Sequence, residues 1–220
     1  MDDEELLAAW KAGDRKAGNT LFERYHPVLQ RFFANKVDSP QELEDLVQSS
    51  FLGCVSGRER IVGTTFRPYL FGIARNQLRK HWARRRVRGR PDSIDELSLA
   101  DLGAGPSTAL TRDDEQRIML EALRRIPLVD QELLEAYYWE GLTGVELAAL
   151  FGISENTLRT HLRAAKRKLA AMLKRLHNFP SPMAPTSSNL ETWARSLRGL
   201  RAGPLGAGQT SSRDSKSRMS

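Results

Sequence analysis

The sequence predicts an all-α fold of two small helical domains, joined by a flexible linker and followed by a mostly disordered tail. Apolar residues recur at helical spacing over most of the 220 residues, and neither strand-like alternation nor Asn-Gly or Asp-Gly hairpin turns occur. The stretches 91–112 and 178–220 are instead rich in Gly, Pro, Ser and charged residues, a composition that buries too little apolar surface to fold. The expected domains are therefore 1–90 and 113–177.

Four helices are expected in the first domain. The first two cover about 3–12 and 17–36. Ser39 and Pro40 begin the third, because Ser suits the N-cap and Pro the first helical position. Residues 53–65 are predicted as a Gly-containing loop or broken helix, and a long helix follows from Phe66 to about Arg86. One face of that helix is expected to carry Phe66, Leu70, Ile73, Ala74, Gln77 and His81.

The second domain contains the signature of a helix-turn-helix. Thr143 can cap a short helix that ends at Phe151, Gly152 allows a sharp turn, and Ser154 can cap the next helix. In that next helix the outward side chains suit the major groove, with Arg for guanine, Asn for adenine and later cations for phosphates. The predicted contacts are Asn156, Thr157, Arg159, Thr160, Arg163, Lys166 and Arg167. The structural alternative is an αα-hairpin with a charged outer face.

Charge is strongly segregated along the chain, although the formal net charge is only +7. Residues 58–90 carry 11 basic and 1 acidic side chains, and residues 156–178 carry 7 basic and none acidic. Two separated basic blocks favour two contacts with a polyanion, most simply nucleic acid. The alternative is a pair of exposed basic helices without a partner.

Several function classes are excluded on composition. No apolar run approaches the ~18 residues needed to cross a bilayer, and the acidic start does not resemble a signal peptide, so a soluble cytoplasmic protein is expected. The single cysteine, Cys54, and four scattered histidines provide no disulfide framework or metal site. No phosphate loop or nucleophile elbow occurs, so neither an enzyme nor a cofactor is expected. Cys54 fits a buried packing residue better than a redox sensor.

Several motifs in the observed order resemble a known family. Residues 21–27, 44–52 and 66–76 resemble region 2 of sigma-70 family sigma factors, specifically the extracytoplasmic-function (ECF) group. Residues 123–127 and the helix-turn-helix after them resemble region 4 of the same group. The resemblance covers about residues 5–175. It implies a sigma factor that binds core RNA polymerase, recognises the −10 and −35 promoter elements and promotes promoter melting.

The resemblance also implies roles for individual residues. Asp45, Gln48 and Ser49 would bind the clamp helices of the polymerase β′ subunit. The residues expected at the −10 element are Arg58, Arg60, Thr64, Thr65, Arg75, Asn76, Arg79 and Lys80, with Arg84, Arg85 and Arg86 on phosphates. The recognition helix would contact the −35 element. The β flap of the polymerase and an anti-sigma factor are the further expected partners.

Two alternatives stay open at this point. The first is a stand-alone helix-turn-helix regulator, which would bind promoter DNA without polymerase. The second concerns Tyr69 and Trp82, which could stack on unpaired bases but fit helix-packing aromatics better.

Overall fold

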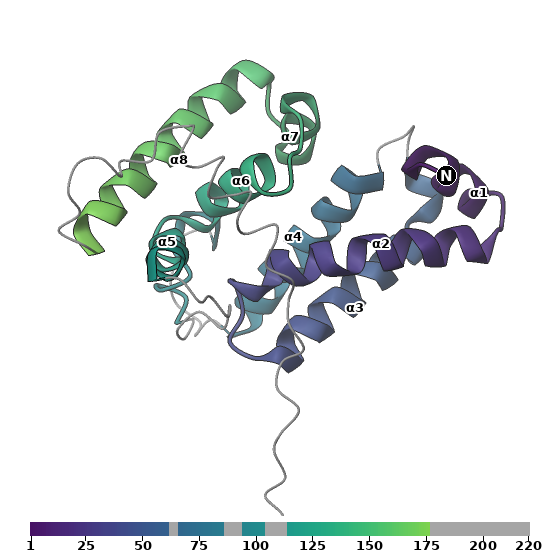
Figure 1. Cartoon of the computed structure of the whole chain (residues 1–220), viewed down its shortest axis with the longest axis horizontal. Helices are drawn as coiled ribbons and strands as arrows, with labels where there is room; N and C mark the ends of the chain where they lie inside the picture. The colour runs from purple at the N-terminus through teal and green to yellow at the C-terminus, as the bar shows by residue number, and fades with distance from the viewer. Residues whose placement is uncertain (62–65, 86–93, 104–113, 177–220) are drawn as a thin grey trace, which may run out of the picture.

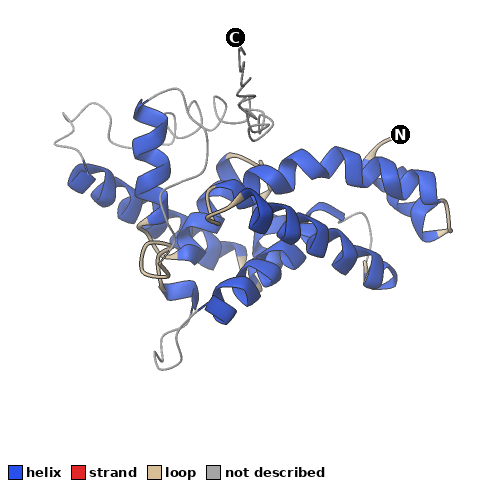
Figure 2. Cartoon of the chain, turned by 90° about the horizontal axis from the view of Figure 1, so that it is seen from below, coloured by secondary structure: helices blue, strands red, loops and turns tan. Residues whose placement is uncertain are grey.

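The described part of the chain is helical. The computed structural model describes residues 1–61, 66–85, 94–103 and 114–176 (Figure 1). Over these residues it has eight α-helices, two short 3-10 turns and no strand beyond one isolated bridge between Ser98 and Pro127 (Figure 2). The all-α prediction is therefore confirmed. The predicted tail, 178–220, lies outside the described residues.

The N-terminal domain consists of α1 (Asp3–Lys11), α2 (Arg15–Ala34), α3 (Pro40–Ser56) and α4 (Phe66–Arg85), with the turn η1 (Arg58–Arg60) before α4. Helix α3 begins at the cap that the sequence predicts, whereas α2 begins at Arg15, two residues before its expected start. The Ser39 side chain accepts a hydrogen bond from the Glu42 amide, and Pro40 occupies the first helical position. The apolar sides of the helices meet in one core, whose fully buried members include Leu21, Leu29, Phe33, Val47, Phe66 and Leu70.

Helix α3 is longer than predicted. The expected loop or broken helix from Gly53 is wrong, since α3 continues to Ser56. Gly53 is a packing residue: a Cβ atom there would lie 2.8 Å from Cγ2 of Ile73 on α4. The glycine thus allows α3 and α4 to approach closely without interrupting the helix.

Helix α4 is buried on more than the predicted face. Phe71, Leu78 and Trp82 are buried in addition to Phe66, Leu70 and Ala74, whereas Gln77 and His81 are only half-buried. The reason is that α4 packs against α3 on one side and against α7 of the C-terminal domain on another. A single apolar stripe is expected for a helix that is covered on one side, whereas α4 is covered on two sides.

The C-terminal domain consists of α5 (Asp114–Arg124), α6 (Leu128–Tyr138), α7 (Gly144–Phe151) and α8 (Glu155–Leu176). Thr143 and Glu146 form a reciprocal capping box at the start of α7. Gly152 ends α7 in the left-handed conformation, with φ of 66°, so that α8 can begin directly after Ser154. The helix-turn-helix elements therefore lie where the sequence predicts them.

The two domains pack against each other (Figure 1). An apolar cluster runs from Phe71 of α4 to Leu133 of α6 and Leu147 of α7 without interruption. Part of the predicted flexible linker, 94–103, also packs here: it contains the turn η2 (Ile94–Glu96), and Leu99 is fully buried. The Leu128 amide donates to the carbonyl of Leu97 at 2.9 Å, which ties this segment to α6. Among the described helices, none combines the length and apolar character that crossing a membrane requires.

Candidate nucleic-acid interface

The recognition helix α8 presents its predicted DNA contacts to solvent. Leu158, Ala165, Leu169 and Leu173 are buried against α5, α6 and α7. The opposite face is exposed, and it carries Asn156, Thr157, Arg159, Thr160, Arg163 and Arg167. Lys166 is half-buried, with Nζ 6.0 Å from the ring centroid of Tyr138. Most of the predicted −35 residues thus form one accessible surface.

Local hydrogen bonds fix the first turn of α8. The Thr157 amide donates to Oγ of Ser154 at 3.2 Å, and the two hydroxyl groups lie 2.8 Å apart. The Thr160 hydroxyl donates to the carbonyl of Asn156 at 3.3 Å. Asn156 and Arg159 are both exposed, so the start of α8 presents polar side chains to solvent, as a recognition helix would.

The residues predicted for the −10 element separate into two groups. Arg60, Asn76 and Lys80 are exposed, and Arg58 is half-buried. Arg58 donates to Glu59 at 3.0 Å, and its guanidinium lies 5.9 Å from the Trp10 ring centroid. Thr64, Thr65 and Arg86 lie outside the described residues. Arg84 is exposed, whereas Arg85 pairs with Glu42 and Asp38 at 2.7 and 3.1 Å.

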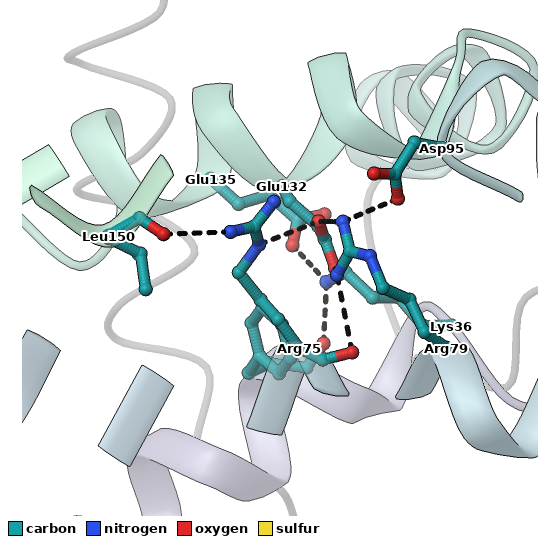
Figure 3. A network of polar contacts seen from close by, with 8 residues as sticks. Lys36, Arg75, Arg79, Asp95, Glu132, Glu135 and Leu150 are labelled. Atoms are coloured by element: carbon teal, nitrogen blue, oxygen red, sulfur yellow. Dashed lines mark hydrogen bonds and ion pairs between the residues drawn. The ribbon is translucent and has the colours of Figure 1, made fainter. Parts of the chain in front are cut away.

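Arg75 and Arg79 form the second group, and both contact the C-terminal domain (Figure 3). Arg75 donates to Glu132 of α6 at 3.0 Å and to the carbonyl of Leu150 at 3.1 Å, and its guanidinium lies 3.9 Å from the Phe151 ring centroid. Arg79 pairs with Glu132 at 2.9 Å and with Asp95 of η2 at 2.6 Å. These two guanidinium groups are therefore engaged within the chain, which the sequence analysis did not anticipate.

Further ion pairs across the same interface were also missed. Lys36, which is fully buried, pairs with Glu135 of α6 and donates to the carbonyl of Phe32 at 2.5 Å (Figure 3). Arg31 of α2 lies 3.4 Å from Glu140. Burial raises the pKa of Glu135 above its ordinary value, although Lys36 and Gln131 oppose that shift. The interface thus sets Glu132 and Glu135 of α6, and Glu140 just after it, against cations of the N-terminal domain.

Glu140 should make the stability of this arrangement depend on pH. Burial raises its pKa, with Arg31, Arg67 and Lys36 acting in the opposite direction. The folded chain therefore holds this proton more tightly than the unfolded chain, and stability falls as pH rises from the ordinary carboxyl range through the raised pKa. In Glu140→Gln this contribution is absent. We expect the difference in unfolding free energy between wild type and variant, measured in urea at several pH values, to change by at most about 1.4 kcal/mol per pH unit. A difference independent of pH would contradict this assignment.

The exposed face of α3 carries the residues predicted to contact polymerase. Asp45 and Gln48 are exposed and Ser49 is half-buried, while Leu46 and Val47 of the same motif are buried in the core. Leu52 and Val55 continue the exposed face and are 66% and 52% exposed. Leu52 and Val55 therefore share one exposed face of α3 with Asp45 and Gln48. Sequence reasoning missed the exposure of Leu52 and Val55. Their helical spacing from Asp45 and Gln48 could have placed them on the same exposed face.

Three residues considered above for other roles are packing residues in the structure: Trp82, Tyr69 and Cys54. Trp82 is buried and donates from its indole nitrogen to the carbonyl of Lys36 at 3.2 Å. Tyr69 is half-buried and donates its hydroxyl to the carbonyl of Gly57 at 3.0 Å. Cys54 is fully buried, and burial raises the pKa of its thiol to about 12, so it is not activated as a thiolate. No cluster of His, Cys, Asp and Glu suited to a metal ion occurs among the described residues.

Comparison with known proteins identifies the family. Residues 21–88 match the family description Sigma-70 region 2, and residues 116–169 match Sigma-70, region 4. The chain is 30% identical over 174 residues to the RNA polymerase sigma factor CarQ of Myxococcus xanthus, covering 77% of this chain and 97% of CarQ. The chain belongs to the sigma-70 family.

Other relatives place this sigma factor in the ECF group. It is 26% identical over 171 residues to the ECF RNA polymerase sigma factor BldN of Streptomyces coelicolor. The matched region covers 77% of this chain and 65% of BldN. The fold is similar to that of CnrH, solved in complex with the cytosolic domain of CnrY, with a TM-score of 0.58 and 20% identity over 79% of this chain and 99% of that chain. Sigma factors are a family of non-catalytic transcription initiation factors.

Proposed function

We propose that this sigma factor binds core RNA polymerase through the exposed face of α3, and recognises promoter DNA through α8 at the −35 element and α4 with η1 at the −10 element. The observation that carries the proposal is the exposed recognition face of α8, presented by a complete helix-turn-helix in a chain of the ECF group. It would act in the cytoplasm, where polymerase and promoters are. An anti-sigma factor remains a proposed partner.

Run-off transcription tests this function directly. Purified core polymerase would be assayed on a promoter library with and without the chain. We expect discrete transcripts only when the sigma factor is present, because core polymerase alone lacks promoter recognition. The stand-alone regulator would instead bind specific duplex DNA without polymerase and produce no sigma-dependent transcript.

Arg159 should recognise a base of the −35 element. It lies in the first exposed turn of α8, where a guanidinium can donate two hydrogen bonds to guanine. Arg159→Ala should cost roughly 1–3 kcal/mol of binding and relax the preference at one −35 position. Run-off transcription on a set of −35 variants measures both effects. Lys174→Ala, an exposed cation in the last turn of α8, is the matched control. Equal losses on every −35 sequence would contradict base recognition by Arg159.

A further inference from the structure

The two proposed DNA-binding surfaces are not equally accessible in this structure. The recognition face of α8 is open to solvent, and its outward residues make no contact with the N-terminal domain among the interactions described. On α4, Asn76 and Lys80 are exposed, but Arg75 and Arg79 lie under α6 and η2 (Figure 3). Their charged ends are therefore withheld from any ligand that approaches α4.

The group that occupies these arginines has the chemistry of a DNA phosphate. Glu132 is 1% exposed, and its carboxylate accepts hydrogen bonds from Arg75 at 3.0 Å and from Arg79 at 2.9 and 3.3 Å. Asp95 of η2 adds a second carboxylate to Arg79 at 2.6 Å. Carboxylate and phosphate oxygens accept the same forked hydrogen bonds from guanidinium. While α6 is docked, a phosphate cannot reach the donors that these carboxylates occupy, because both arginine side chains are largely covered.

Two neighbouring ion pairs also join a carboxylate of the C-terminal domain to a cation of the N-terminal domain. Glu135 pairs with Lys36, and Glu140 with Arg31, so three carboxylates along and just beyond α6 face cations of the N-terminal domain. The apolar cluster that continues from α4 to α6 and α7 surrounds these pairs and reduces the access of water to them. Water exclusion strengthens each ion pair relative to the same pair at an exposed surface.

We propose that Glu132 and Asp95 substitute for DNA phosphates on α4, so that docking of α6 and binding of the single-stranded −10 backbone by Arg75 and Arg79 are mutually exclusive. This inference rests on the proposed function and deepens it. The free chain then has an accessible −35 surface and a covered −10 surface. By linkage, whatever weakens the α6 contact strengthens single-stranded DNA binding, up to the affinity of the fully undocked chain.

Binding of a short, fluorescently labelled single-stranded DNA to the full chain, without polymerase, tests the competition. Glu132→Gln keeps the shape of the side chain and removes the charge held by both arginines. We expect this variant to bind the DNA at least about fivefold more tightly than wild type, the lower end of the usual range for coupled sites. Combining it with Arg75→Ala and Arg79→Ala should abolish the gain, because the gain comes from those two guanidinium groups.

Glu121→Gln is the matched control. It removes the same charge from the same domain and releases one arginine, since Glu121 pairs with Arg125 at 2.7 Å, but it lies on α5, away from α4. It should bind single-stranded DNA within about twofold of wild type. Equal gains in Glu121→Gln and Glu132→Gln would overturn the proposal, and so would a gain in Glu132→Gln that survives removal of both arginines. Run-off transcription by the wild-type chain reports separately on the proposed function, because sigma-dependent transcripts would appear whether or not docking of α6 competes with DNA for Arg75 and Arg79.

Discussion

Lys36→Met should separate the two domains at neutral pH. Lys36 is fully buried and is the cation paired with Glu135, whose carboxylate is otherwise bonded to Nε2 of Gln131 at 2.8 Å. Removing one member of a buried ion pair leaves the other charge uncompensated, at a cost of about 3–5 kcal/mol. Methionine retains the aliphatic packing of the lysine stem, so the loss is mainly electrostatic. Separation of α6 from α2 returns Glu135 to water and relieves this cost.

Small-angle X-ray scattering measures the expected result as a larger radius of gyration than in wild type. The double variant Lys36→Met, Glu135→Leu should be compact again, because replacing both charges with apolar groups is often neutral or stabilising. Lys168→Met is the control: Lys168 pairs with Asp130 at 2.5 Å inside the C-terminal domain, so loss of this pair should leave the two domains in contact. A compact Lys36→Met variant at neutral pH would show that this pair does not hold the domains together.

The helix-turn-helix could be predicted from sequence because its determinants are local. Thr143 caps α7 through Glu146 three residues later, and Gly152 supplies the left-handed turn that lets Ser154 cap α8. Each of these signals acts within one turn of helix. The exposed residues of α8 then follow from helical periodicity, because α8 is covered on one side only.

The environment of Arg75 and Arg79 could not be predicted in the same way. Their partner Glu132 is 57 residues from Arg75 and 53 from Arg79, so no local pattern joins them. The charge segregation of the chain did contain a signal, since the basic block 58–90 is complementary to the net acidic stretch 116–155. Complementary charge fits an external polyanion and an internal carboxylate equally well, and only the fold distinguishes them. The buried face of α4 was also predicted incompletely. Because α4 is covered on two sides, its apolar residues do not form the single stripe from which one buried face is predicted.

Leu52→Arg should weaken binding to core RNA polymerase by about 2 kcal/mol or more, roughly 30-fold, if the exposed face of α3 is the contact surface. Leu52 is 66% exposed and lies on the same helix face as Asp45, Gln48 and Val55. A large apolar side chain near the centre of such a face gains from losing its contact with water when a partner covers it. A charged arginine would be buried there without a partner. Asp45→Arg combined with Gln48→Ala should weaken binding in the same assay, since those side chains flank the apolar pair.

Fluorescence anisotropy of the labelled full chain with core polymerase measures this affinity, and thermal unfolding followed by circular dichroism reports on the fold. Because Leu52 is exposed, Leu52→Arg should change the unfolding free energy by no more than about 0.5 kcal/mol. Ala8→Arg adds the same charge at an exposed position of α1 in the same domain and should leave the affinity unchanged. If Leu52→Arg and Ala8→Arg bind polymerase equally well with the fold intact, the exposed face of α3 is not the polymerase contact. If only Leu52→Arg is impaired while its DNA binding through α8 persists, the loss must arise at α3, since α8 belongs to the other domain and its recognition face is open.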